Sequence, residues 1–205
     1  MKLPYALCAL LLSGAVHAAN DCGPLIHHDQ GGDYTNATDR EGLPVVEQFH
    51  FTPEVEHLIR GKSGDLGSDI DYTLDHFPNH HRALAAMARL ALRGKTNRPP
   101  GAKYTVQCYF DRALRVRADD PQVHSLFGGY LLALGDLDSA LEQLSMAARL
   151  EPGNATAQYN LGLLYVRKHD YAQALVCAHA AYALGFPLEG LKKQLIAAGQ
   201  WHDAP

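Results

Sequence analysis

Histidines are the side chains in this sequence with the widest chemical range. The chain contains 12 of them, with adjacent pairs at His27–His28 and His80–His81. Neutral imidazole is a common ligand for zinc, copper and nickel. The stretch HHDQGGD also places the first pair near the carboxylates of Asp29 and Asp33. One candidate function is therefore that of a histidine-rich metal-binding or metal-handling protein.

The spacing of these residues does not specify a metal geometry. The sequence has no HExxH, no CxxCH and no CxxC with a partner motif, which are the spacings that place ligands around one ion. Histidines that are solvated or that cap helices explain the same residues. We assign no metal ligands, and metal binding remains the alternative function.

Catalytic motifs are also missing from the sequence. It has no glycine-rich phosphate loop, no nucleophile elbow and no cysteine with an evident base. The paired acids Asp69 with Asp71 and Asp119 with Asp120 suit helix caps. We expect a non-catalytic protein without a cofactor.

The first residues, MKLPYALCALLLSGAVHAAN, have the layout of a secretory signal peptide. Lys2 precedes an apolar run, and the small residues Val16 and Ala18 are placed for cleavage after residue 18. The run is shorter than the roughly 20 apolar residues that span a bilayer, although a retained anchor is the competing interpretation. The sequence predicts an exported, periplasmic protein with no membrane span in the mature chain.

Three cysteines would remain after cleavage: Cys22, Cys108 and Cys177. Export to an oxidising compartment favours a disulfide, and the odd count leaves at least one thiol unpaired within the chain. We predict a bond between Cys22 and Cys108, which would stabilise the fold by roughly 4 to 5 kcal/mol in the chain-entropy model. Cys177 lies in the run YAQALVCAHAAYAL and suits a small buried position.

Composition excludes one class of partner. Hydrophobic residues make up 47% of the chain and the formal net charge is −4, so the chain can form a core but lacks the clustered Lys and Arg that neutralise phosphates. We therefore expect no nucleic-acid partner.

An internal repeat in the sequence predicts the helices on which the residues discussed above would lie. When the chain is shifted by 34 residues, small and apolar positions mostly coincide with one another. The positions that coincide are Phe127, Gly128, Gly135, Asp136, Leu137, Ala140, Leu141 and Ala147 with Leu161, Gly162, His169, Asp170, Tyr171, Ala174, Leu175 and Ala181. This period and pattern resemble the tetratricopeptide repeat family, in which pairs of antiparallel helices stack into a solenoid.

The predicted fold is all-α, a helix-turn-helix solenoid with an irregular N-terminal segment and a C-terminal capping helix. Capping residues and Pro or Gly breaks predict helices over 80–93, 104–116, 121–134, 137–150, 155–168 and 171–184. An earlier helix is expected to start at Ser68, with Asp71 completing a capping box. The expected divisions are a signal peptide (1–18), the irregular segment with one short helix in FTPEVEHLI (19–66), repeats (67–186), and the capping helix with its tail (187–205).

Gly128 and Gly162 interrupt helices where glycine costs about 1 kcal/mol relative to alanine. The repeat accounts for them if the two helices of one unit approach closely there, with Ala140 and Ala174 opposite. We expect both glycines to be packing residues.

The resemblance implies a concave groove that binds a peptide or another protein. Carried over to this chain, its lining comprises Arg82, Arg89 and Arg93, then Gln122, Ser125, Gly129 and Leu132, then Tyr159, Asn160, Leu163 and Arg167. The arginines and the asparagine suit an acidic segment or a chain-terminal carboxylate. The family's carboxylate-clamp pattern is matched only in part, because the second unit has no basic residue. A solvated helix face is the competing interpretation of the arginines.

Overall fold

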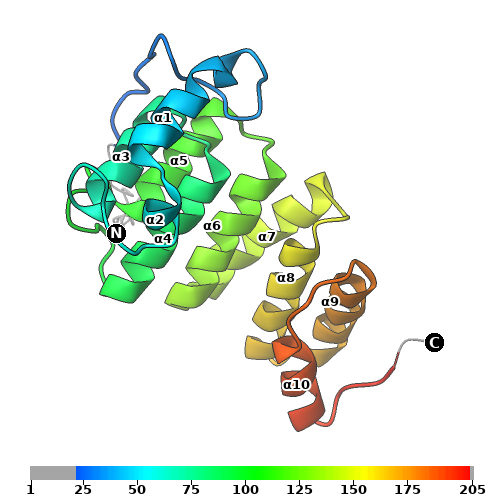
Figure 1. The fold of residues 1–205 in the computed structure, drawn as a ribbon. Coiled ribbons are helices and arrows are strands. Elements are labelled where there is room, and N and C mark those ends of the chain that lie inside the picture. The colour runs from blue at the N-terminus through cyan, green and yellow to red at the C-terminus, as the bar shows by residue number, and fades with distance from the viewer. Residues whose placement is uncertain (1–21, 204–205) are drawn as a thin grey trace, which may run out of the picture.

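The computed structural model describes residues 22–203, and within this range the regular structure is helical (Figure 1). The expected signal peptide at 1–18 lies outside the described residues. The elements in chain order are η1 (Asp39–Gly42), α1 (Leu43–His50), α2 (Pro53–Glu56), α3 (Leu66–His76), α4 (His81–Gly94), α5 (Val106–Val116), α6 (Pro121–Leu134), α7 (Leu137–Leu150), α8 (Ala155–Arg167), α9 (Tyr171–Ala183) and α10 (Gly190–Ala197). The predicted all-α class is confirmed.

Short polar side chains set the starts of the repeat helices. Asp120, Asp136, Asn154 and Asp170 each cap a helix by accepting a hydrogen bond from a backbone N–H in its first turn. Such a cap contributes about 0.5 to 2 kcal/mol. The helices predicted over 121–134 and 137–150 have those bounds, while the next two end one residue earlier than expected.

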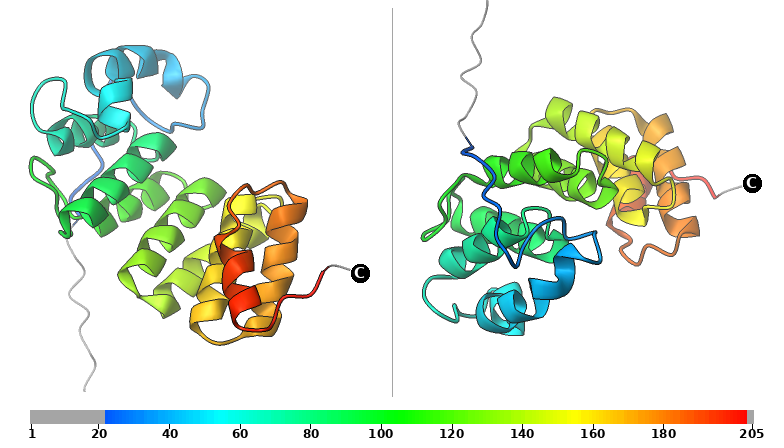
Figure 2. Two further views of the ribbon diagram at one scale, coloured as in Figure 1. Left: turned by 60° about the horizontal axis from the view of Figure 1, so that its bottom comes forward. Right: turned by 90° about the horizontal axis from the view of Figure 1, so that it is seen from above.

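The helices pack as successive pairs, α4 with α5, α6 with α7 and α8 with α9. Figure 2 shows the pairs following one another along the chain from green through yellow to orange. Their apolar faces form three clusters of buried side chains, each containing residues from neighbouring elements. Each pair thus buries its core against the next pair, as expected of a solenoid.

The two helical glycines have different neighbours. A Cβ on Gly128 of α6 would lie 2.5 Å from Cγ of Leu144 on α7, so the close approach within the second pair is present. A Cβ on Gly162 of α8 would lie 2.3 Å from a methyl carbon of Leu191 on α10, whereas the nearest atom of Ala174 is its carbonyl oxygen at 3.4 Å. Gly162 therefore makes room mainly for the capping helix, and not for Ala174 as we expected.

The segment before α3 is more helical than the sequence indicated. Only a short helix was expected within 51–59, but α1 precedes it and α2 occupies only Pro53–Glu56. Phe51, Val55 and Leu58 are buried in the same cluster as Leu84 and Met87 of α4. This segment therefore shares the core of the repeats.

The predicted start of α3 was wrong. The helix begins at Leu66 with Asp65 at its N-cap, and neither Ser68 nor Asp71 caps it. Asp71 instead accepts hydrogen bonds from the backbone N–H of Lys103 and the hydroxyl of Tyr109. Asp69, also assigned to capping, is buried and accepts bonds from the N–H groups of Lys62 and Ser63. Both carboxylates bind loops that approach the helix from elsewhere.

A disulfide joins Cys22 to Cys108 on α5, as predicted. Arg112, whose side chain is only 1% exposed, donates to the carbonyl oxygens of Cys22 and Pro24 at 3.0 and 2.7 Å. The start of the described chain is therefore fixed to α5 by one covalent bond and by a buried guanidinium. Cys177 is a buried free cysteine, and burial raises the pKa of its thiol to about 11.

The last helix, α10, covers the end of the solenoid. Leu191 and Leu195 are fully buried there, whereas Leu188 precedes the helix and is 58% exposed. Trp201 contacts His179 and Tyr182 of α9 through ring contacts. Within residues 22–203, no helix combines the length and apolar character needed to cross a membrane.

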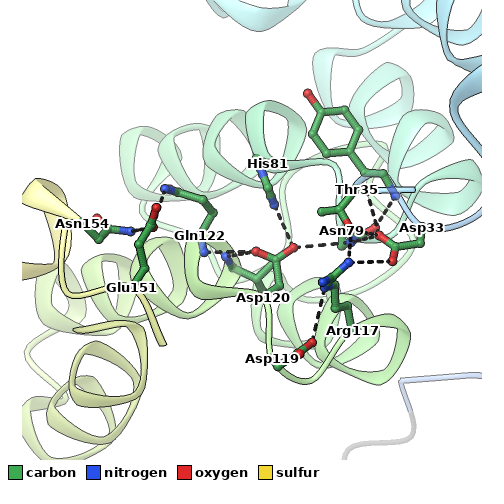
Figure 3. A network of polar contacts seen from close by, with 12 residues as sticks. Asp33, Thr35, Asn79, His81, Arg117, Asp119, Asp120, Gln122, Glu151 and Asn154 are labelled. Carbon is green, nitrogen blue, oxygen red and sulfur yellow. Dashed lines mark hydrogen bonds and ion pairs between the residues drawn. The ribbon is translucent and has the colours of Figure 1, made fainter. Parts of the chain in front are cut away.

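A network of polar contacts runs along the N-terminal ends of α4, α6 and α8 (Figure 3). Asn79, buried before α4, donates to Asp33 of the N-terminal segment at 2.7 Å and to Asp120, the cap of α6, at 3.4 Å. From there the contacts continue through Gln122 and Glu151 to Asn154, the cap of α8. The network therefore links three successive pairs at the starts of their first helices.

Candidate functional site: a pocket in the concave groove

The first helices of the pairs, α4, α6 and α8, contact one another in sequence and form a row (Figure 1). A pocket of about 210 Å³ lies between these three helices. It is lined by Ala85, Ala88, Arg89, Leu92, Ser125, Leu126, Gly129, Tyr130, Thr156 and Asn160. The pocket thus lies on the row of helices where the resemblance implied a groove.

The pocket has one apolar wall and one polar side. The α4 side contributes mainly small and aliphatic residues, while Ser125 of α6 and Asn160 and Thr156 of α8 contribute polar groups. Gly129 keeps the space beside Asn160 open, because a Cβ there would lie 3.1 Å from the amide nitrogen of Asn160. An apolar cavity with a few convergent polar groups is the usual form of a binding site.

Three of the predicted groove arginines have the same bonding pattern. Arg89 donates to the carbonyl oxygen of Glu56 at 2.9 Å, Arg93 donates to that of Leu58 at 2.9 Å, and Arg167 donates to that of Leu132. None of the three has a carboxylate partner among the residues that the structure describes. Their guanidinium groups are oriented by backbone oxygens, and no carboxylate within residues 22–203 neutralises their charges.

Arg82 differs from these three. Its guanidinium forms ion pairs with both Glu47 of α1 and Glu56 of α2. Its charge is therefore neutralised by the N-terminal segment, which packs against α4. The structure places this predicted site residue at a contact within the chain, outside the pocket.

Two further predicted groove residues lie at the junction with the capping helix. Tyr159 is 8% exposed and stacks on Phe186 with ring centroids 4.2 Å apart. Leu163 is partly buried and packs against the clusters on both sides of α8. Of the predicted set, Arg89 and Asn160 line the pocket, as do Ser125 and Gly129.

The histidines serve other contacts of the fold. His80 is fully buried, and its Nδ1 accepts the backbone N–H of Ala83 at the start of α4. His81 contacts Asp120 at 2.8 Å, and His28 contacts Asp75 at 2.9 Å. Throughout residues 22–203, no three histidine, cysteine or acidic side chains are grouped so that they could bind a metal ion. The geometry thus gives the metal-binding alternative no support.

Asp120 illustrates how these contacts affect ionisation. Burial raises its pKa, but the hydrogen bond and the charge of His81 oppose this, together with the capping N–H of Val123, and the net pKa lies below its ordinary value. Asp120 therefore stays ionised as an acceptor for four neighbours, namely Asn79, His81 and the backbone N–H groups of Gln122 and Val123. Its capping role was visible in the sequence, whereas its contact with Asn79 joins positions 41 residues apart and had no local signal.

Comparison with known proteins places the repeat in a family. Residues 130–169 match a family described as TPR repeat. This segment runs from the second half of α6 through α7 and α8. A search of curated proteins found no match. The chain therefore contains a TPR repeat at residues 130–169, and the helix pairs on both sides of the matched segment continue its architecture.

Proposed function

We propose that this protein is a periplasmic scaffold or adaptor whose concave groove binds an acidic segment of another protein. The observation that carries the proposal is the set Arg89, Arg93 and Arg167, which project from α4 and α8 without carboxylate partners in the described chain. Guanidinium groups bind carboxylates with two parallel hydrogen bonds, and orientation by a backbone carbonyl reduces the side-chain entropy lost on binding.

The repeat itself supports an interaction role. Solenoids of this kind present extended concave surfaces, and the matched family is typically composed of interaction modules. The sequence has no catalytic motif, and the pocket contains no titratable pair suited to acid–base chemistry. These features favour a non-catalytic function.

Three observations support export. The first 18 residues have the layout of a signal peptide. The Cys22–Cys108 bond would persist in an oxidising compartment. The described helices include none suited to span a membrane. The periplasm satisfies all three, and a partner there would have to present its acidic segment in extended or helical form.

The test is a crosslinking pull-down from the exporting cell with a charge-reversed groove. Arg89→Glu combined with Arg167→Glu should abolish recovery of the partner. The matched control is Arg98→Glu combined with Arg149→Glu, which makes the same change in charge at exposed positions that do not line the groove pocket. Equal recovery by the two double variants would refute the groove as the binding surface.

Metal analysis of the purified protein belongs in the same experiment. The alternative function requires bound zinc, copper or nickel in a fixed ratio to the chain. Stoichiometric metal together with unchanged partners in the groove variant would move the function to the histidine-rich N-terminal segment.

A further inference from the structure

Ser125 is the unusual residue of the groove pocket. It lies on α6, its exposed fraction is 1%, and it lines the pocket. Its Oγ is a buried side-chain atom with no hydrogen-bond partner, the only such atom among the described residues. A buried hydroxyl without a partner costs free energy that most buried polar groups avoid. In a binding site, however, a ligand can pair with such a hydroxyl.

Asn160 provides a second unused polar group. Its side-chain amide is partly buried on α8, lines the same pocket and makes no hydrogen bond within the described chain. The amide nitrogen lies beside Gly129, one helical turn after Ser125 on α6. Two neutral groups, a hydroxyl and a carboxamide, therefore converge on one cavity. Each can both donate and accept a hydrogen bond.

The charged side chain and the neutral polar side chains of the pocket differ in how deeply they are buried. Ser125 is nearly inaccessible and Asn160 is partly buried, whereas Arg89 is exposed. The guanidinium of Arg89 is also drawn toward the N-terminal segment by its bond to the carbonyl oxygen of Glu56. The inner part of the pocket is thus polar and uncharged, and its mouth is positive. A buried carboxylate would lose its hydration without a cation beside it, while a neutral amide would lose much less.

The volume limits what can enter. At about 210 Å³ the cavity is smaller than the 300–1,000 Å³ or so that accommodates a drug-sized ligand. A single side chain fits this scale better than a cofactor. The aliphatic wall formed by Ala85, Ala88 and Leu92 suits the methylene stem of such a side chain.

We infer that the pocket is a receptor for one carboxamide side chain, glutamine or asparagine, within the acidic segment of the partner. The amide would pair with Ser125 and Asn160, its stem would lie against α4, and neighbouring acidic residues would lie outside on Arg89 and Arg167. This inference rests on the proposed function and adds the identity of the anchoring residue. The unpaired hydroxyl of Ser125 carries it.

The test uses fluorescein-labelled peptides of the form Asp-Glu-X-Glu-Asp, with X as Gln, Asn, Glu, Leu or Ala, titrated with the protein and followed by fluorescence anisotropy. The better of the two carboxamide peptides should bind about tenfold more tightly than the Leu and Ala peptides, because an apolar residue leaves the buried hydroxyl unpaired. Ser125→Ala should reduce that preference to less than about threefold while leaving the Leu peptide unchanged or slightly tighter.

A second readout is independent of affinity differences among peptides. The side-chain amide resonances of Asn160, identified by their loss in Asn160→Asp, should shift on addition of the Gln peptide and remain in place with the Ala peptide. This measurement also reports the folded state of each variant through the rest of the spectrum.

The outcomes separate this inference from the function on which it rests. Binding that depends on Arg89 and Arg167 but not on X would overturn the carboxamide receptor and leave the scaffold intact. If the Glu peptide binds most tightly, the carboxamide receptor is refuted and the pocket is a carboxylate receptor instead. If none of the peptides binds even at low salt, both the acidic segment and its anchor are refuted.

Discussion

Acidification should destabilise this protein through His80, whose ring is enclosed before α4. Its Nδ1 accepts the N–H of Ala83 at 3.1 Å, so the proton of the neutral ring lies on Nε2 and points to Glu47 at 3.0 Å. The rings of Tyr34 and Phe51 and the guanidinium of Arg82 also face it. Burial is the main cause that lowers the pKa of His80 from its ordinary 6.5 to about 4, and Glu47 opposes this only in part.

Whether acid stabilises or destabilises the fold depends on which state, folded or unfolded, binds the proton more readily. Between pH 6.5 and 4 the unfolded chain protonates at this position and the folded chain does not, so stability is full above pH 6.5 and is lost as pH falls through this window. With 1.36 kcal/mol per pKa unit, the free energy of unfolding should fall by about 2 kcal/mol between pH 7 and pH 5 from this residue alone. Protonation would also remove the acceptor that caps α4.

The assay is urea unfolding followed by circular dichroism at pH 7, 6 and 5, comparing the wild type with His80→Asn. Asparagine can cap α4 but does not titrate. The free energy of unfolding of this variant should therefore fall by about 2 kcal/mol less than that of the wild type between pH 7 and pH 5. The comparison is needed because burial and the nearby His28 also lower the pKa of His76. Parallel pH profiles for the two proteins would refute the assignment of the acid sensitivity to His80.

Three further predictions follow from packing and covalent structure. Ser125→Ala should leave the free energy of unfolding unchanged or raise it by about 1 kcal/mol in urea, since no hydrogen bond is lost; a loss of that size would show that the hydroxyl is paired. Gly128→Ala should lower the free energy of unfolding by roughly 1 to 3 kcal/mol, because the new methyl group would overpack against the fully buried Leu144. The control Gly94→Ala should not lower it in the same urea unfolding experiment, because its new methyl group would meet only Thr96 at 3.4 Å. Reduction of the Cys22–Cys108 bond should cost about 2 to 4 kcal/mol, measured by denaturation with and without reductant, and equal midpoints would contradict it.

Local signals in the sequence were enough for the repeats. Helices α6 to α9 each begin at a capping Asp or Asn and follow a 34-residue period, and the sequence shows both features directly. The start of α3, in contrast, was not predicted correctly from local signals. Ser68 and Asp71 have the spacing of a capping box, yet Asp71 binds Tyr109, 38 residues away, and the helix begins before Ser68. A long-range hydrogen bond competed with a local one, and the sequence pattern does not show that competition.

The groove could be predicted only as a face of three helices. Repeat geometry predicted Arg89, Ser125 and Asn160 on that face, because the period determines which side of each helix points inward, and all three line the pocket between α4, α6 and α8. It could not show that Arg82 is neutralised by Glu47 and Glu56, since these come from a segment that has no counterpart in the repeat. It also gave no sign that Ser125 lacks a partner, because that depends on every atom around it.

The N-terminal segment explains why the positive charge of the groove is graded along the row of helices. It neutralises Arg82 with two carboxylates, but it offers Arg89 and Arg93 only the backbone oxygens of Glu56 and Leu58. Because Val55 and Leu58 are buried in the first core cluster, the segment is not free to leave and expose Arg82 to a competing ligand. Uncompensated charge therefore begins at Arg89, at the mouth of the pocket that contains Ser125 and Asn160. A partner that enters the groove should meet its first available guanidinium beside its first available hydrogen-bonding cavity, which favours an acidic residue and a carboxamide residue close together in one segment.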